Sequence, residues 1–286
     1  MRESQAVGVR FFALPHGSGR PRIDVALQGG LFRPDTVQAM APAMTIVLPP
    51  SEGKAPGGTT DNQVGAFDEE LDESRRRVAK ALGAAARGID PVEGKRLFGA
   101  TGFLLERAIA CAEEVASGTA LVLPAWQRYT GVVWSHLQPA SLAPIQREAL
   151  VVPSGLYGLS VGTDLIADFR LTMGASLSGV GKLSSFWRRS LTDALENYVG
   201  EGVVYDLLTS EQRAALDYRR LSQLDGYVPV EFVRRDGHGA AGHAAKAIKG
   251  IVARTLLDAG VDGVARLKWQ GWRTSIRGRV ITVIAP

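Results

Sequence analysis

Apolar and polar positions along the chain follow two different periods. Short apolar runs rich in β-branched residues predict strands over residues 45–48, 120–123, 149–152, 203–208, 228–233 and 280–284. Longer stretches with apolar residues three and four positions apart predict helices over residues 71–87, 103–116, 184–198, 210–218 and 240–259. Because the strands and helices are interspersed, the pattern predicts an α/β or mixed α+β fold.

The pattern is unclear before Met44. Glycine and proline recur through residues 1–43, whereas a clean apolar run begins directly after Met44. A length of 286 residues fits one large domain or two closely fused ones. We expect a single compact domain over residues 44–286, with a central mixed sheet and surrounding helices. Residues 1–43 are expected to be an N-terminal extension or leader, and an arm that docks on the body is the alternative.

Composition narrows the class of protein. Hydrophobic residues make up 45% and charged residues 22%, which excludes a wholly disordered chain. No apolar run approaches the roughly 18 residues of a membrane span, so we expect no membrane partner. The single cysteine, Cys111, excludes an intrachain disulfide and a cysteine-based zinc site, and it fits a cytoplasmic location. We therefore expect a cytoplasmic monomer without a metal or a cofactor.

Positive charge is concentrated toward the C-terminus. The net charge is +4, and between Arg234 and Arg279 ten basic residues stand against three acidic ones. This balance permits an anionic partner without requiring one.

Polar residues follow the first predicted strand. Pro49-Pro50 ends the strand, and Ser51, Glu52, Gly53 and Lys54 come next. Open α/β sheets bind ligands just beyond the carboxyl ends of their strands, and a lysine there can meet a phosphate. The segment is not a Walker A loop, because the required glycine spacing is absent. The alternative is a solvent turn with a lysine at the strand end.

Two further polar segments follow apolar runs. Arg128 and Tyr129 offer a bidentate donor and a stacking face, although a strand edge with a half-buried tyrosine is the alternative. Ser154 and Tyr157 lie in a glycine-rich turn whose N–H groups can hold an anion, and Arg170 follows them. The alternative is a structural turn, with Arg170 paired to a nearby aspartate.

Two glycine-rich segments precede predicted helices. Gly179-Val180-Gly181-Lys182 is similar to the centre of a helix-hairpin-helix element, and a plain loop before a helix is the alternative. The segment 237–242 fits Gly-x-Gly-x-x-Gly, but too little chain follows it for a dinucleotide fold. Lys246 and Lys249 share a stripe of the last predicted helix, which is either a solvated face or a phosphate-binding one.

Taken together, these segments resemble the YaaA family of peroxide stress response proteins, from residue 44 to about residue 285. The resemblance implies a compact α/β domain with a positively charged cleft, DNA binding and a helix-hairpin-helix-like element. Several positions depart from the family pattern; Phe169 and Thr172, for example, stand where a tyrosine and a glutamate are usual. The segments that carry the resemblance are residues 48–54, 129–131, 154–158, 164–173, 181–187, 209–211 and 245–250.

Two functions are compatible with these residues. In the first, the protein binds the DNA phosphate backbone in a cationic cleft as part of the peroxide stress response. In the second, it is an enzyme acting on a nucleotide-like or phosphorylated small molecule, because backbone binding gives no reason for Glu52 beside Lys54. Here Arg170 and Lys182 hold phosphate, Tyr157 stacks on a base, and Glu52 is the acid or base. The candidate catalytic residues are thus Glu52 and Lys182, and the candidate binding residues are Ser51, Lys54, Arg128, Tyr129, Ser154, Tyr157, Arg170, Gly179, Gly181, Lys246 and Lys249.

Overall fold

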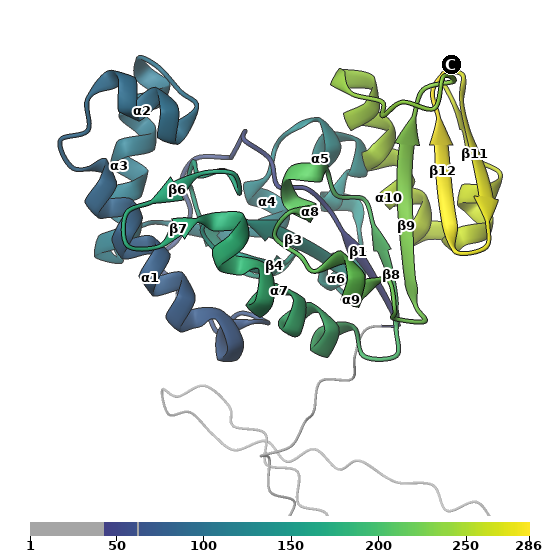
Figure 1. Ribbon diagram of the computed structural model, residues 1–286, viewed down its shortest axis with the longest axis horizontal. Helices are drawn as coiled ribbons and strands as arrows, with labels where there is room; N and C mark the ends of the chain where they lie inside the picture. Colours follow the sequence, from purple (N-terminus) through teal and green to yellow (C-terminus); the bar gives the residue numbers. More distant parts are fainter. Residues whose placement is uncertain (1–42, 62) are drawn as a thin grey trace, which may run out of the picture. The chain divides into compact units, whose positions relative to one another are not determined.

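The computed structural model describes residues 43–61 and 63–286 (Figure 1). The expected leader, residues 1–43, lies outside the described residues except for Ala43. The strands are β1 (Met44–Val47), β2 (Val122–Pro124), β3 (Leu150–Ser154), β4 (Gly158–Val161), β5 (Leu165–Ala167), β6 (Ser176–Leu177), β7 (Gly181–Lys182), β8 (Val203–Asp206), β9 (Tyr227–Val233), β10 (Lys268–Trp269), β11 (Trp272–Arg277) and β12 (Val280–Ile284). The helices are α1 (Asp68–Ala86), α2 (Pro91–Phe98), α3 (Phe103–Ser117), α4 (Ala125–Arg128), α5 (Val132–Leu137), α6 (Pro144–Glu148), α7 (Leu183–Val199), α8 (Ser210–Arg213), α9 (Tyr218–Leu221) and α10 (Gly242–Ala265), with a 3₁₀ turn at Pro139–Ser141.

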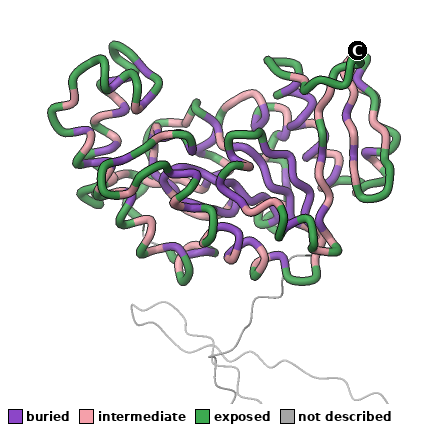
Figure 2. The backbone as a smooth tube through the Cα atoms, viewed as in Figure 1, coloured by how far each residue is buried: buried purple, intermediate pink, exposed green. Residues whose placement is uncertain are grey.

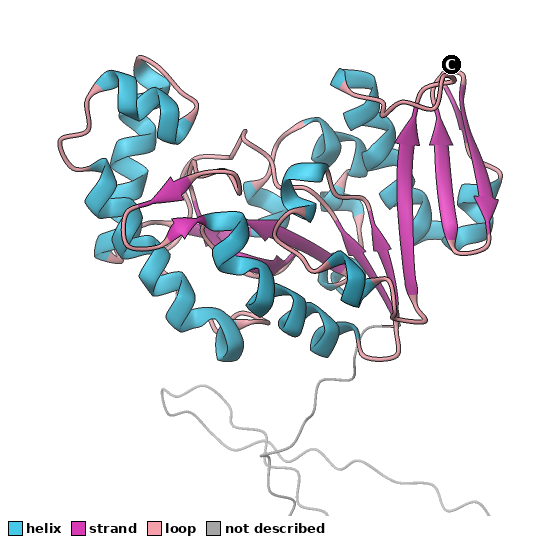
Figure 3. Ribbon diagram, in the orientation of Figure 1, coloured by secondary structure: helices cyan, strands magenta, loops and turns pink. Residues whose placement is uncertain are grey.

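A mixed sheet of eight strands organises the domain, in the order β10-β11-β12-β9-β8-β1-β3-β4. The strands β3, β1, β8, β9 and β12 run parallel, whereas β4 and the β10–β11 hairpin are antiparallel to their neighbours. Helix α7 passes in front of the sheet and α10 lies behind β9 (Figures 1 and 3). The expected α/β domain with a mixed sheet and surrounding helices is confirmed.

Burial differs between the middle and one end of the sheet. Strands β3 and β4 are buried along their whole length, and β1 is buried after its first residue. In β12 and its neighbour β11, burial alternates or fades, as expected for strands with one face in solvent (Figure 2). The core is therefore centred on β1, β3 and β8, whose apolar runs were the clearest strand signals.

The sequence located the long elements well and the short ones poorly. Strand β12 has the predicted bounds, and the predicted helix over residues 103–116 is α3. The predicted helix over residues 210–218 was wrong in extent: α8 and α9 are separate four-residue helices. The last helix runs further than predicted and is interrupted at Gly260, whose φ of 61° lies outside the helical range.

The segment before α7 is a β-hairpin. Gly179 and Gly181 have φ values of 74° and 87°, which favour glycine; Gly179 lies in the turn between β6 and β7, and Gly181 is the first residue of β7. A strand rather than a helix precedes this turn, so the expected helix-hairpin-helix element is not formed here. In the described part of the chain, no helix is long and apolar enough to span a bilayer.

Helix α10 packs closely on α5 through a glycine. A Cβ atom added to Gly250 would lie 2.2 Å from the carbonyl oxygen of Val133 and 2.9 Å from Cβ of His136. Because backbone cannot move aside easily, the contact requires a residue without a side chain. This close approach fixes α10, and with it Lys249, against α5.

We predict that Gly250→Ala lowers the free energy of unfolding by about 1–3 kcal/mol, because overpacking outweighs the better helix propensity of alanine. Gly239→Ala is the matched control, since nothing lies within 4 Å of its added Cβ and its φ is not positive. Chemical denaturation measures both variants. Equal stability of the two would contradict the packing argument.

Candidate functional site

A cleft of about 450 Å³ opens at the carboxyl ends of β1, β3 and β8. Strand β1 lies between β3 and β8. The next strand of this sheet after β1 is β3, on one side, whereas the next strand after β8 is β9, on the other side. Such a switch point is where open α/β sheets bind ligands. The polar and charged residues that line the cleft are Ser51, Glu52, Lys54, Ser154, Arg170, Thr172, Thr209, Glu211, Gln212, Lys246 and Lys249.

Lys54 stands between aromatic rings on one side of the cleft. Its Nζ lies 4.2 Å from the ring centre of Phe169 and 5.6 Å from that of Tyr129. The ammonium group donates one hydrogen bond of 2.9 Å to the carbonyl oxygen of Ser51, which leaves two of its three donors for a ligand. Burial lowers the pKa of Lys54 to about 8, although nearby Asp168 opposes the shift.

Arg170 ties the cleft to the end of helix α2. Its Nε donates to the carbonyl oxygen of Phe98 at 2.7 Å, and its second terminal nitrogen lies 2.9 Å from Oε2 of Glu52. The carboxylate of Glu52 is largely exposed, whereas Arg170 is mostly covered. The structure therefore brings together two residues from distant motifs and leaves Glu52 accessible at the cleft.

Lys249 reaches the cleft from α10 and is buried. Its Nζ donates to the carbonyl oxygen of Leu207 and lies 4.4 Å from the ring centre of Phe232. Burial lowers its pKa to about 8, against the attraction of Asp206. The cleft thus holds two lysines, Lys54 and Lys249, whose charged forms are disfavoured in the absence of an anion.

The carboxylate nearest to Lys249 is engaged elsewhere. Asp206 is buried at the end of β8 and accepts hydrogen bonds from the hydroxyls of Tyr218 and Tyr227. It also accepts the N–H of Leu208 at 2.8 Å, and Nε of Arg213 lies 3.2 Å away. Because these partners occupy Asp206, it only partly offsets the cost of burying Lys249.

Ser154 lines the cleft near β3, whereas Tyr129 does not line it and lies beside Lys54. Ser154 is buried, and its Oγ accepts the N–H of Tyr157 at 3.2 Å. Tyr129 is buried, its hydroxyl makes no hydrogen bond in the described structure, and burial raises its pKa. Tyr129 supports Lys54 through its ring, and its hydroxyl is not in position to titrate at neutral pH.

Several predicted site residues lie outside the cleft. Arg128 is fully buried and donates to the backbone carbonyls of Ala55, Gly57, Leu121 and Ile166, so its guanidinium serves the fold. The hydroxyl of Tyr157 accepts the N–H of Ala167 at 2.8 Å and borders a different pocket. The hairpin residues Gly179, Gly181 and Lys182 are exposed and do not line the cleft.

Sequence reasoning missed the aromatic and apolar walls of the cleft. Phe98, Trp134 and Phe169 line it, although each is buried. Thr209, Glu211 and Gln212 close the side after β8. The position of Thr209 just beyond a strand was the available signal, because the same rule had identified Ser51 and Ser154.

The described residues offer little for a metal or for thiol chemistry. Within residues 43–61 and 63–286, no group of three histidine, cysteine or acidic side chains could hold a metal ion. Burial raises the pKa of Cys111 to about 11, with Asp168 and Glu114 adding to the shift. A thiol with so little thiolate at neutral pH is a poor nucleophile toward peroxide.

The chain matches one protein-family model and is similar to several bacterial proteins. The family model described as peroxide stress protein YaaA matches residues 44–274. UPF0246 protein SCO2297 of Streptomyces coelicolor is 31% identical over 233 residues, which cover 78% of this chain and 87% of that protein. UPF0246 protein CE1889 of Corynebacterium efficiens is 30% identical over 223 residues, which cover 74% and 84%.

We predict that the stability difference between the protein and its Lys249→Met variant depends on pH. Between pH 8 and pH 10.5 the unfolded chain keeps a proton on Lys249 that the folded protein has released. The free energy of unfolding of the protein relative to the variant therefore rises as pH increases across this window, by up to about 3 kcal/mol, and it is level below pH 8 and above pH 10.5. Urea denaturation at several pH values measures the difference.

The matched control for this measurement is Lys246→Met, which removes an exposed amine from the same helix. Groups that titrate elsewhere in the protein contribute equally to each comparison. A rise of the same size with Lys246→Met would contradict burial as the cause.

Proposed function

The chain belongs to the YaaA family of peroxide stress proteins, and on that premise we propose that its cleft binds a phosphorylated, nucleotide-like small molecule and acts on it. The observation that carries the proposal is the pair of buried amines, Lys54 and Lys249, in one cleft at the switch point of the sheet. Groups with strongly perturbed pKa values in a concave pocket are typical of active sites.

The size and lining of the cleft support a small ligand. About 450 Å³ falls within the range of small-molecule sites. Four basic residues and two acidic ones line it, which favours an anion. A phosphate in the backbone of a DNA duplex can reach an exposed amine such as that of Lys246, but it is poorly suited to reach the buried amine of Lys249.

The proposed roles follow from position. Lys54 and Lys249 each keep two donors beyond their backbone bonds, and these hold the phosphate. The rings of Phe98 and Phe169 border the cleft and offer apolar surface to a base, a role that we no longer assign to Tyr157. Glu52 is the accessible carboxylate at the cleft and serves as general acid or base, oriented by Arg170.

We predict that a panel of nucleotides and sugar phosphates contains a ligand that raises the melting temperature of the full chain. Lys54→Met and Lys249→Met should each weaken its binding at least about tenfold, because each removes a charge-assisted hydrogen bond. Glu52→Gln should abolish turnover of that ligand and leave binding nearly unchanged.

Lys182→Met is the control for this panel, because Lys182 is an exposed lysine outside the cleft. Its affinity should match that of the unchanged protein. A panel without any thermal shift, or equal losses with Lys182→Met and Lys249→Met, would contradict the proposed site.

A second candidate function, binding of the DNA phosphate backbone, is favoured by a different surface. Lys268 and Arg273 are directly paired across β10 and β11, and Arg277 lies four residues further along β11. Side chains two or four positions apart share a face of a strand, so all three point the same way. They are exposed, whereas Trp272 on the opposite face is buried.

If this candidate is correct, replacing Lys268, Arg273 and Arg277 together by glutamine should weaken duplex binding and flatten its salt dependence. Each lost phosphate contact lowers the slope of log affinity against log salt by about 0.9. Fluorescence anisotropy of labelled duplex over a salt series measures the slope. An unchanged slope in the triple variant, or a loss of duplex binding in Lys249→Met instead, would contradict this surface.

A further inference from the structure

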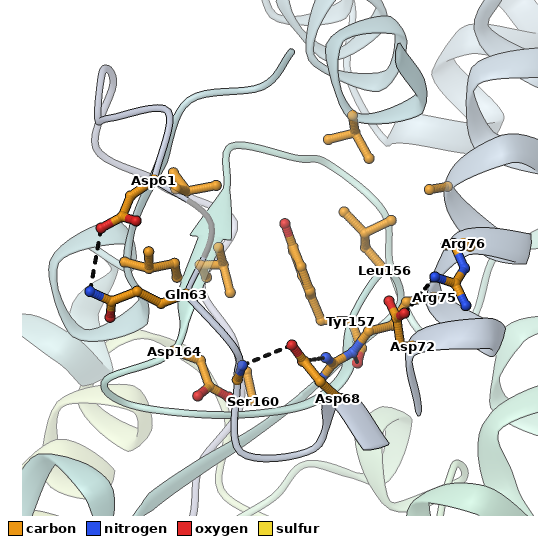
Figure 4. A pocket seen from close by; sticks show the side chains of 16 residues that line it. Asp61, Gln63, Asp68, Asp72, Arg75, Arg76, Leu156, Tyr157, Ser160 and Asp164 are labelled. Carbon is orange, nitrogen blue, oxygen red and sulfur yellow. Dashed lines mark hydrogen bonds and ion pairs between the residues drawn. The ribbon is translucent and has the colours of Figure 1, made fainter. Parts of the chain in front are cut away.

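A second pocket, separate from the cleft, lies between α1 and the strands β4 and β5. Its volume is about 330 Å³, and it shares no lining residue with the cleft. Figure 4 shows the ring of Tyr157 standing in the pocket, with Asp68, Asp164 and Ser160 at its lower end. The function proposed above makes no use of this pocket.

One hydroxyl of the pocket lacks a partner. Ser160 lies on β4 and is 1% exposed, and its Oγ makes no hydrogen bond in the described structure. A buried hydroxyl without a partner costs free energy, so a ligand that bonds to it gains what the free protein lacks. A serine hydroxyl can accept from a donor group on that ligand.

Among the described residues, some acidic side chains of the pocket form ion pairs with arginines, whereas Asp164 does not. Asp68 pairs with Arg75, and Asp72 pairs with Arg76. Asp164 takes part in none of the ion pairs formed among residues 43–61 and 63–286, although burial raises its pKa. Its two oxygens accept the N–H groups of Ala66 at 3.0 Å and of Val161 at 2.8 Å, so each keeps a second lone pair for a ligand.

The two polar groups lie at the same end of the pocket. Asp164 and Ser160 lie near each other in Figure 4. The carboxylate of Asp164 accepts the N–H of Val161, which is the neighbour of Ser160 on β4. Part of the remaining wall is aliphatic, formed by Val115, Val122, Leu156, Leu165 and Ile166. Its charged part holds more acidic than basic side chains, with Asp61, Asp68 and Asp72 against Arg75 and Arg76. A ligand that matches this lining carries positive charge on a short hydrocarbon chain.

We propose that this pocket binds a small aliphatic ammonium ligand, such as a diamine, with Asp164 as counter-ion and Ser160 Oγ as hydrogen-bond acceptor. An ammonium group supplies three donors and a positive charge, which suit a carboxylate and a free hydroxyl. The ring of Tyr157 adds a face to which a cation is attracted. A divalent metal fits less well, because the described acidic side chains include no group that could coordinate one.

The test measures binding of cadaverine and of 1-pentanol to the full chain by calorimetry, at neutral pH and physiological salt. Both probes have a five-carbon chain, but only cadaverine is charged. Cadaverine should bind at least about tenfold more tightly than 1-pentanol, as expected for a charge-assisted hydrogen bond. Equal affinity of the two probes, or no cadaverine binding at about 10 mM, would overturn the proposal.

Variants locate the binding. Asp164→Asn should weaken cadaverine binding at least about tenfold, and Ser160→Ala should weaken it about three- to tenfold. Because Ser160 Oγ has no partner in the described structure, Ser160→Ala should keep the stability of the protein. This variant therefore tests whether cadaverine binds in this pocket even if Asp164→Asn folds poorly. Glu52→Gln removes a carboxylate from the other pocket and should leave the affinity unchanged. Full affinity in Ser160→Ala, or an equal loss in Glu52→Gln, would refute the site.

Discussion

The parallel pairing of β1 with a neighbour on each side is the constraint on which the rest of the structure depends. In a strand buried among other strands, every backbone N–H and C=O must find its partner in the ladder, and β1 finds these partners in β3 and β8. All three strands run in the same direction. All three strands then end at one edge. The chain can present polar groups only where the ladder stops, and for that reason Ser51, Ser154 and Thr209 meet in one cleft although about a hundred and fifty residues separate the first from the last.

The buried carboxylate at the end of β8 shows how polar groups at this edge of the sheet are stabilised. Asp206 is buried, yet two tyrosine hydroxyls, a backbone N–H and Arg213 surround its oxygens. A fully satisfied carboxylate costs little, whereas an amine with one bond and no close counter-ion costs more. Lys249 is in the second situation. The fold therefore places the satisfied Asp206 beneath the cleft and leaves two buried amines, those of Lys54 and Lys249, lining it.

The sequence predicted which residues lie near strand ends and turns better than it predicted which way their side chains point. Ser51, Glu52, Lys54, Ser154 and Arg170 follow strand ends or glycine turns in the sequence, and they line one cleft because the carboxyl ends of parallel strands meet. Arg128 and Tyr157 stand in equally polar segments, but their side chains turn inward to backbone groups at Ile166 and Ala167, and no local pattern shows which way a side chain turns. Short elements such as α8 and α9 depend on tertiary contacts, so local periodicity joined them into one helix. Phe169, one of the departures from the family pattern, places its ring beside the amine of Lys54.

The two pockets carry opposite deficits of charge. In the cleft, the amines of Lys54 and Lys249 lack an anion; in the second pocket, Asp164 lacks an ion-paired cation among the described residues. In each case burial shifts the pKa toward the neutral form, upward for the carboxyl and downward for the amines. A ligand of the missing sign reverses the shift, so its binding is coupled to keeping a proton on the lysines or losing one from Asp164. Any ligand that binds the folded state in this way also stabilises it, by an amount that grows with the logarithm of its concentration relative to its Kd. In each pocket, the burial of a charge without an ion-pair partner in the described structure is therefore unfavourable in the free protein, and the same burial favours binding of a ligand of opposite charge.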